Sequence, residues 1–120
     1  MGYDIEETFD MSPLLENALD DVVRYLEESD IQDPVCLLQD AIENINLYTE
    51  QEIFKEGRTI PDNVCNLVIE KAGSNDNIRG AIKLILQAHN EKSVISLKYA
   101  ILLMENEIEY LNKRILKDVD

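Results

Sequence analysis

The 120-residue sequence contains few side chains of the types that usually carry out catalysis. It has one histidine, His89, and two cysteines, Cys36 and Cys65. Histidine is a common general acid or base, but no residue near His89 has metal-ligand spacing, and its place near the end of an expected helix predicts a partly exposed side chain. The cysteines do not form a Cys-x-x-Cys motif and lie among apolar residues, which predicts two buried free thiols.

Acidic side chains on helices could also form a metal site, but the required spacing is absent. Di-metal helical bundles use Glu-x-x-His motifs, and this sequence has none. Glu105, Glu107 and Glu109 flank an apolar helical pattern and are expected to face solvent, with Glu109 paired to Lys113 one turn later. The sequence also has no glycine-rich phosphate loop. We therefore expect no enzymatic activity, no catalytic residue, no metal and no cofactor.

The distribution of charge is the most informative feature of the composition. The net charge is −14, and residues 1–56 contain 16 Asp or Glu against only Arg24 and Lys55. Residues 57–120 contain nine acidic and nine basic residues, so the excess is confined to the first half. Such a chain would repel a phosphate backbone, which argues against direct binding of nucleic acid.

A concentrated acidic surface favours a basic protein as the partner, because it accelerates encounter and sharpens specificity. Carboxylates along helices can also imitate phosphate charge. We therefore expect an inhibitor or immunity-type protein that covers the basic site of a nuclease or nucleic-acid-binding protein; the alternative is that the acidic half only maintains solubility. The candidate contact residues are Glu16, Asp20, Asp21, Glu27, Glu28, Asp30, Asp33, Asp40 and Glu43.

The elements that position these candidate residues are expected to be helices, because the chain is rich in Ile and Leu and poor in aromatic residues and glycine. The sequence predicts an all-α fold: a compact bundle of about five helices packed around a long C-terminal helix, residues 93–117. Residues 1–11 are expected to form an acidic arm, and residues 12–120 a single helical domain. Nothing resembles a signal peptide or an apolar run of membrane-spanning length, so we expect a cytoplasmic protein that does not bind membranes.

Capping residues predict where the helices begin. Ser-Pro at residues 12–13, Asp-Pro at 33–34, the segment 59–62, the loop 74–77 and Ser93 each precede an apolar pattern with helical period. Thr49 and Glu52 have the spacing of a capping box, which predicts either a short extra helix at residues 49–56 or a continuation of the preceding one. The apolar positions expected to face inward include Val64 and Leu67, and residues 78, 81, 82, 85 and 86.

The C-terminal helix carries an apolar seam with spacings of three and four residues. Its members are Leu97, Ile101, Met104, Ile108, Leu111 and Ile115. Further apolar residues, among them Ile95 and Leu102, broaden the seam, so more than one neighbour is expected to cover it. The seam is either the core of a monomeric bundle or a surface for self-association, in which case the chain would be a structural or adaptor subunit and a homodimer.

Overall fold

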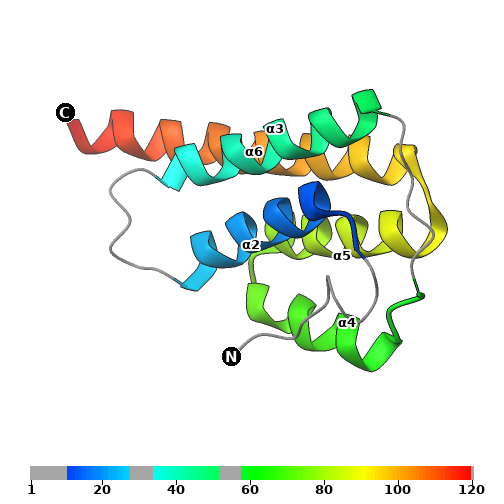
Figure 1. Cartoon of the computed structure of the whole chain (residues 1–120). Helices are drawn as coiled ribbons and strands as arrows, with labels where there is room; N and C mark the ends of the chain where they lie inside the picture. The colour runs from blue at the N-terminus through cyan, green and yellow to red at the C-terminus, as the bar shows by residue number, and fades with distance from the viewer. Residues whose placement is uncertain (1–10, 28–33, 52–57, 120) are drawn as a thin grey trace.

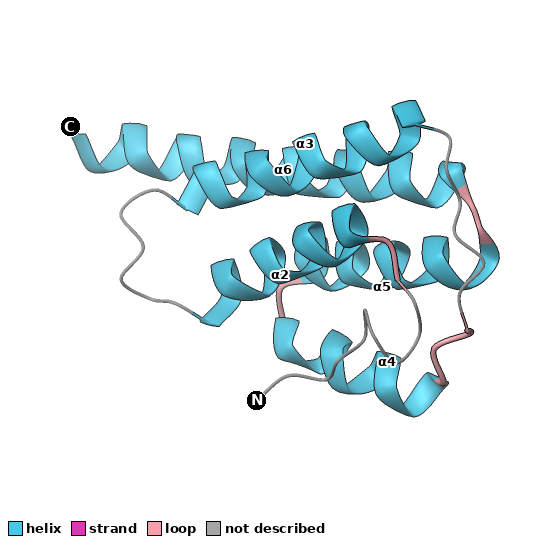
Figure 2. Cartoon of the chain, viewed as in Figure 1, coloured by secondary structure: helices cyan, strands magenta, loops and turns pink. Residues whose placement is uncertain are grey.

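The computed structural model describes residues 11–27, 34–51 and 58–119, with side chains as far as residue 113. These residues form helices and loops without any strand, which confirms the predicted all-α class (Figure 2). The elements are α2 (Pro13–Glu27), α3 (Pro34–Gln51), α4 (Asp62–Ile69), the 3₁₀-helix η1 (Glu70–Ala72), α5 (Asp76–Glu91) and α6 (Val94–Val119).

Four long helices form the bundle, arranged as two hairpins. α2 packs along α3 and α5 packs along α6, while further contacts join α3 to α6 and α2 to α5. Each of these four helices runs antiparallel to the two that it contacts (Figure 1). The shorter α4 and η1 lie against α5, and η1 also touches α2. α6 is the longest helix, but α5 contacts more of the other elements than any other helix does: α2, α4, η1 and α6.

Most of the predicted helix boundaries are confirmed by hydrogen bonds or backbone angles. Pro13 begins α2, and the carbonyl of Ser12 accepts from the amide of Glu16 at 2.9 Å. Asn75 caps α5 by accepting from the amide of Ile78 at 3.1 Å, and the hydroxyl of Ser93 accepts from the amide of Ser96 at 3.2 Å. Such side chains satisfy amides that lack a partner in the first helical turn.

η1 and α5 each end at a residue in the left-handed region of backbone conformation, with positive φ. Gly73 follows η1 with φ of 57°, as expected for a glycine terminator, and Lys92 caps α5 with φ of 55°. Of the two alternatives predicted at Thr49, the continuation of the preceding helix is confirmed, because α3 runs through this position to Gln51. The Thr49 hydroxyl donates to the carbonyl of Asn46 at 2.8 Å within the helix. Residues 52–57 lie outside the described part of the chain.

The core is built from the inward faces of all five helices. All five α5 positions expected to face inward are buried, and Met11, placed in the expected arm, is also buried. Leu67 is an exception: it was expected to face inward with Val64 and Val68 but is 44% exposed, and of these three only Val68 is buried. Gly80 lets α5 and α6 approach closely, since a Cβ there would lie 2.7 Å from Cδ1 of Leu103. The fully buried large side chains are Met11, Leu15, Leu38, Ile45, Ile60, Ile78, Ile82, Ile85, Leu86, Leu97, Met104 and Val22.

Candidate functional site

The hairpin formed by α2 and α3 contains a groove lined almost entirely by polar side chains. Its volume is about 400 Å³, and four of the nine predicted contact residues line it. The lining residues are Asn17, Asp20, Asp21, Arg24, Asp40, Glu43 and Asn44. We call this surface the acidic groove.

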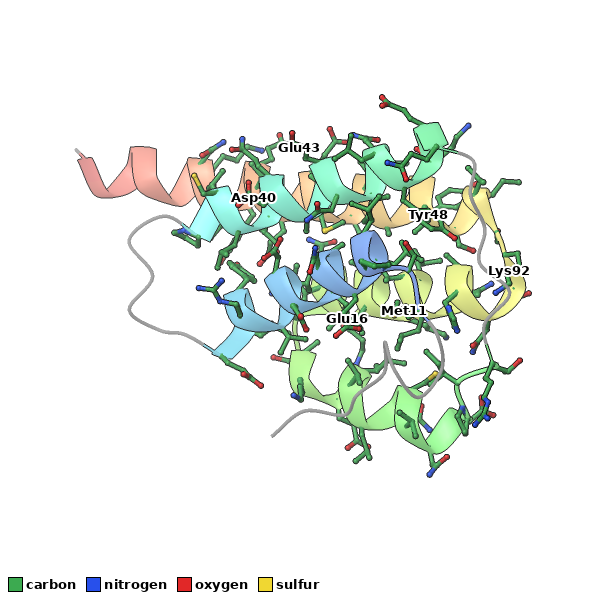
Figure 3. The ribbon with its side chains drawn as sticks, in the orientation of Figure 1. Met11, Glu16, Asp40, Glu43, Tyr48 and Lys92 are labelled. Carbon is green, nitrogen blue, oxygen red and sulfur yellow. The ribbon has the colours of Figure 1, made fainter. Side chains whose placement is uncertain are left out.

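Helical geometry explains why these residues meet. On α2, positions 17, 20, 21 and 24 are three or four residues apart and therefore share one face, as do positions 40, 43 and 44 on α3. The opposite faces of both helices are buried through Leu15, Leu19 and Leu38. Asp40 and Glu43 project from α3 (Figure 3). They line the same groove as Asp20 and Asp21 of α2. The two walls of the acidic groove thus have like charge.

The crowding of carboxylates has a consequence for Asp21. Partial burial raises the pKa of this carboxyl above its ordinary value of 3.8, and the negative charge of Asp40 raises it further. Asp20 acts in the same direction, whereas the guanidinium of Arg24 opposes the shift. The folded protein therefore holds the Asp21 carboxylate in an environment that would favour an additional cation.

Replacing Asp21 by asparagine is expected to stabilise the fold at pH 7. Because the pKa of Asp21 is higher in the folded than in the unfolded state, its ionised form destabilises the fold, and that penalty disappears as the pH falls to 3.8. We expect a gain below about 1 kcal/mol, since solvent screens this site. Urea unfolding of both proteins from pH 7 to pH 3 measures it: the gain should shrink with falling pH, and a D21N protein less stable at pH 7 would contradict the charge crowding.

Two of the other predicted contact residues, Glu16 and Glu27, do not line the acidic groove. Glu27 is exposed and pairs with Lys71 of η1 at 3.2 Å. Glu16 is partly buried, and its Oε2 is hidden from solvent. Besides α3, the elements that pack against α2 are α5 and η1. Glu28, Asp30 and Asp33 lie outside the described residues.

The predicted apolar seam of α6 packs within the chain. Leu97 and Met104 are completely buried, and Ile101, Ile108 and Leu111 are partly buried against the core. The side chain of Ile115 lies outside the described part. Self-association through these positions stays a prediction, and it would compete with the intramolecular packing. The expected surface pair of Glu109 with Lys113 is confirmed, with 3.2 Å between Oε1 and Nζ.

The predicted environments of His89 and Cys36 are wrong. His89 is only 3% exposed, because α5 continues to Glu91 and keeps it on the inner face. Its Nε2 lies 2.8 Å from the carbonyl oxygen of Arg58, which can only accept, so Nε2 donates. Cys36 is exposed, since it lies about 200° around α3 from the buried Leu38.

Cys65 and Asn90 connect the loop before α4 to α5. Cys65 is half-buried, and burial, assisted by the charge of Asp62, raises the pKa of its thiol. A higher pKa leaves less thiolate, so this cysteine is a poor nucleophile. Asn90 holds Ile60 from both sides: its Oδ1 accepts from the amide at 2.7 Å and its Nδ2 donates to the carbonyl at 3.2 Å. These contacts fix the loop rather than form a reactive site.

A buried carboxylate that the sequence did not indicate links three helices. Glu107 of α6 is 5% exposed, so the expectation that it faces solvent is wrong. Its Oε2 accepts from the hydroxyl of Tyr25 at 2.6 Å and from Nδ2 of Asn75 at 2.8 Å. Position 107 shares the α6 face of the core residues Met104 and Ala100, about one and two turns earlier. This position on the core face was the one feature of the sequence that could have indicated burial of Glu107. Its two hydrogen-bond donors come from distant parts of the chain and could not be predicted.

Further findings concern metals, membranes and related proteins. Among the described residues, no group of three or more His, Cys, Asp or Glu side chains could hold a metal ion. Within the same residues, every helix is too short or too polar to cross a membrane. Comparisons with protein-family models, with curated proteins and with solved structures found no match to this chain. Function must therefore be inferred from the surface itself.

Proposed function

We propose that the chain is an acidic protein-binding module whose groove between α2 and α3 receives the basic site of a partner protein. The carrying observation is the convergence of Asp20, Asp21, Asp40 and Glu43 from two helices on one groove. An inhibitor or immunity-type protein that covers the basic site of a nuclease or other nucleic-acid-binding protein fits this surface best. The carboxylates would take the place of the phosphates that such a site normally binds.

The electrostatics of the groove support a cationic ligand group. A lysine or arginine side chain inserted between α2 and α3 would lie near Asp21 and Asp40 together and remove their mutual repulsion. That repulsion, with burial, already raises the pKa of Asp21, so binding would lower this pKa again and release any proton held there. Exposed Asp20, Asp40 and Glu43 would steer the encounter over a longer range, which makes association dependent on salt.

Capture of the partner from a lysate of the source organism tests this proposal. The tagged full chain is used as bait at low and at moderate salt, and the eluted proteins are identified by mass spectrometry. We expect one stoichiometric basic protein whose recovery falls as the salt concentration rises. Recovery of the bait alone would contradict the proposal and leave the acidic half as a solubilising surface.

The groove itself is tested by a variant with four amide substitutions, D20N, D21N, D40N and E43Q. Because the amides keep the shape of the side chains and remove like charges, the fold should remain stable. We expect affinity for the captured partner to fall roughly a hundredfold or more, measured by titration calorimetry.

A matched control variant carries E50Q, D62N, E70Q and E91Q, which change the net charge equally at exposed positions outside the groove. We expect it to retain most of the affinity. Equal losses in the two variants would show that overall charge, and not the acidic groove, is responsible for binding.

A further inference from the structure

The outer face of α6 carries a row of exposed apolar side chains. Of the six large apolar side chains that are exposed in the described part of the chain, four belong to this helix. They are Ile95 at 66%, Tyr99 at 57%, Leu102 at 54% and Tyr110 at 53% exposed. At about 100° per residue these four positions fall within about 80° of one another, and Asn106 occupies the gap between Leu102 and Tyr110. We call these four residues the outer stripe.

The outer stripe lies on the opposite side of α6 from the core. Met104 is completely buried, and Leu102 is two residues, or about 200°, away from it. A helix on the surface of a monomeric bundle normally presents polar residues on its outer side. A row of exposed apolar side chains at this place is therefore typical of an interaction surface.

We propose that the outer stripe binds a second copy of this chain, with the two α6 helices antiparallel. The first argument is the spacing. When the helix is reversed about a point between residues 102 and 103, position 95 takes the place of position 110, and position 99 takes the place of position 106. A two-fold axis at this point places Ile95 opposite the partner subunit's Tyr110. It also brings the two copies of Leu102 together at the centre, as an isologous interface requires.

The second argument is charge complementarity along one flank of the stripe. Lys98 lies on this flank on the N-terminal side of the proposed axis, and Glu105 and Glu109 lie on the same flank on its C-terminal side. All three side chains are exposed. In an antiparallel pair, Lys98 of each copy lies beside the partner subunit's Glu105 and Glu109. In a parallel two-fold pair, this flank of one copy would instead meet the opposite flank of the other copy, so Lys98 would have neither carboxylate beside it, which opposes that orientation.

The proposed dimer leaves the acidic groove accessible, because the groove belongs to α2 and α3 and the outer stripe to α6. The four carboxylates of the acidic groove therefore do not enter the interface. One dimer would present two grooves, which favours a partner with repeated or paired basic sites. This inference does not depend on the proposed function, since self-association is measured on the purified chain.

The interface is small, so we expect a dissociation constant in the micromolar range. Four half-exposed side chains provide less than the roughly 800 Å² per partner of a standard interface. The test is sedimentation velocity of the full chain from about 5 to 500 μM, a range that brackets such an affinity. We expect the mass to rise from monomer to dimer across this range. A protein that remains monomeric at the highest concentration would overturn the proposal.

Substitutions distinguish this surface from others. Leu102→Glu places two carboxylates at the two-fold axis, so we expect at least a tenfold weaker dimer with an unchanged unfolding midpoint of the monomer. The matched control is Leu67→Glu, at an exposed leucine on α4 outside the stripe, which should leave the dimer intact. A dimer that survives Leu102→Glu would overturn the assignment to the outer stripe.

The orientation is tested by exchanging charges. Lys98→Glu and Glu105→Lys should each weaken the dimer, and the double variant should restore most of the loss, because the pair is re-formed with opposite signs. Failure of the double variant to recover would overturn the antiparallel arrangement.

Discussion

Replacing Met104 by alanine is expected to lower the free energy of unfolding by roughly 2–5 kcal/mol, the usual range for a large-to-small change in a packed core. Met104 is completely buried on the inner face of α6 and belongs to the core cluster. The substitution removes the end of the side chain and leaves a cavity whose walls cannot fully close. Urea unfolding followed by circular dichroism measures the loss, and a far-UV spectrum like that of the natural protein would show that helices persist.

Leu102→Ala on the same helix is the matched control. Leu102 is 54% exposed, so its truncation should cost less than about 1 kcal/mol. Both variants are compared at low micromolar concentration, where self-association contributes little to stability. Equal losses at positions 102 and 104 would contradict the described rotation of α6 about its own axis. A larger loss at Leu102 would mean that the predicted seam and the outer stripe exchange roles.

The contrast between Leu102 and Met104 shows which features of the fold can be predicted from the sequence and which cannot. Helix boundaries depend on local chemistry, so the proline after Ser12, the Asn75 cap and the Ser93 cap could all be located in advance. The inward face of α5 could be predicted as well, because its apolar positions form one stripe. α6 is apolar on two faces, and periodicity cannot say which face a neighbour covers. The expectation that neighbours cover both Ile95 and Leu102 is therefore wrong.

The acidic character of the groove could be predicted from the sequence, but the residues that line it could not. The confinement of acidic residues to the first half pointed to α2 and α3. Which carboxylates converge depends on the relative rotation of these helices, and that rotation is fixed by packing across the core. Asp20 and Asp40 are 20 residues apart in sequence and share the groove, whereas Glu27, at the C-terminal end of α2, pairs with Lys71 of η1. Nothing local to Glu27 indicates this pairing.

Glu107 is the position where sequence reasoning fails most clearly and where a second large effect is expected. Glu107→Ala should lower the free energy of unfolding by roughly 2–4 kcal/mol, because it removes two hydrogen bonds to a charged acceptor. The donors are the Tyr25 hydroxyl and the Asn75 amide, at 2.6 and 2.8 Å. Glu105→Ala, at an exposed position of the same helix, is the control and should change stability by less than about 0.5 kcal/mol.

The Glu107 contact also holds the cap of α5. Asn75 donates to Glu107 through Nδ2 while its Oδ1 accepts from the amide of Ile78 at 3.1 Å. Loss of the carboxylate should therefore accelerate hydrogen exchange at the Ile78 amide in addition to lowering stability. Glu107→Gln keeps one acceptor oxygen without charge, so its cost should be about half that of alanine.

A double-mutant cycle with Tyr25→Phe separates this network from simple loss of packing. If the hydrogen bond is the cause, the two substitutions together should cost less than the sum of their separate effects, since each removes the same interaction. Strictly additive losses, or an Ile78 amide that exchanges at an unchanged rate in the Glu107→Ala protein, would show that Glu107 does not couple α2 to the start of α5. Coupling would mean that one buried carboxylate joins the two hairpins, so α2, which forms one wall of the acidic groove, is held in place from α6.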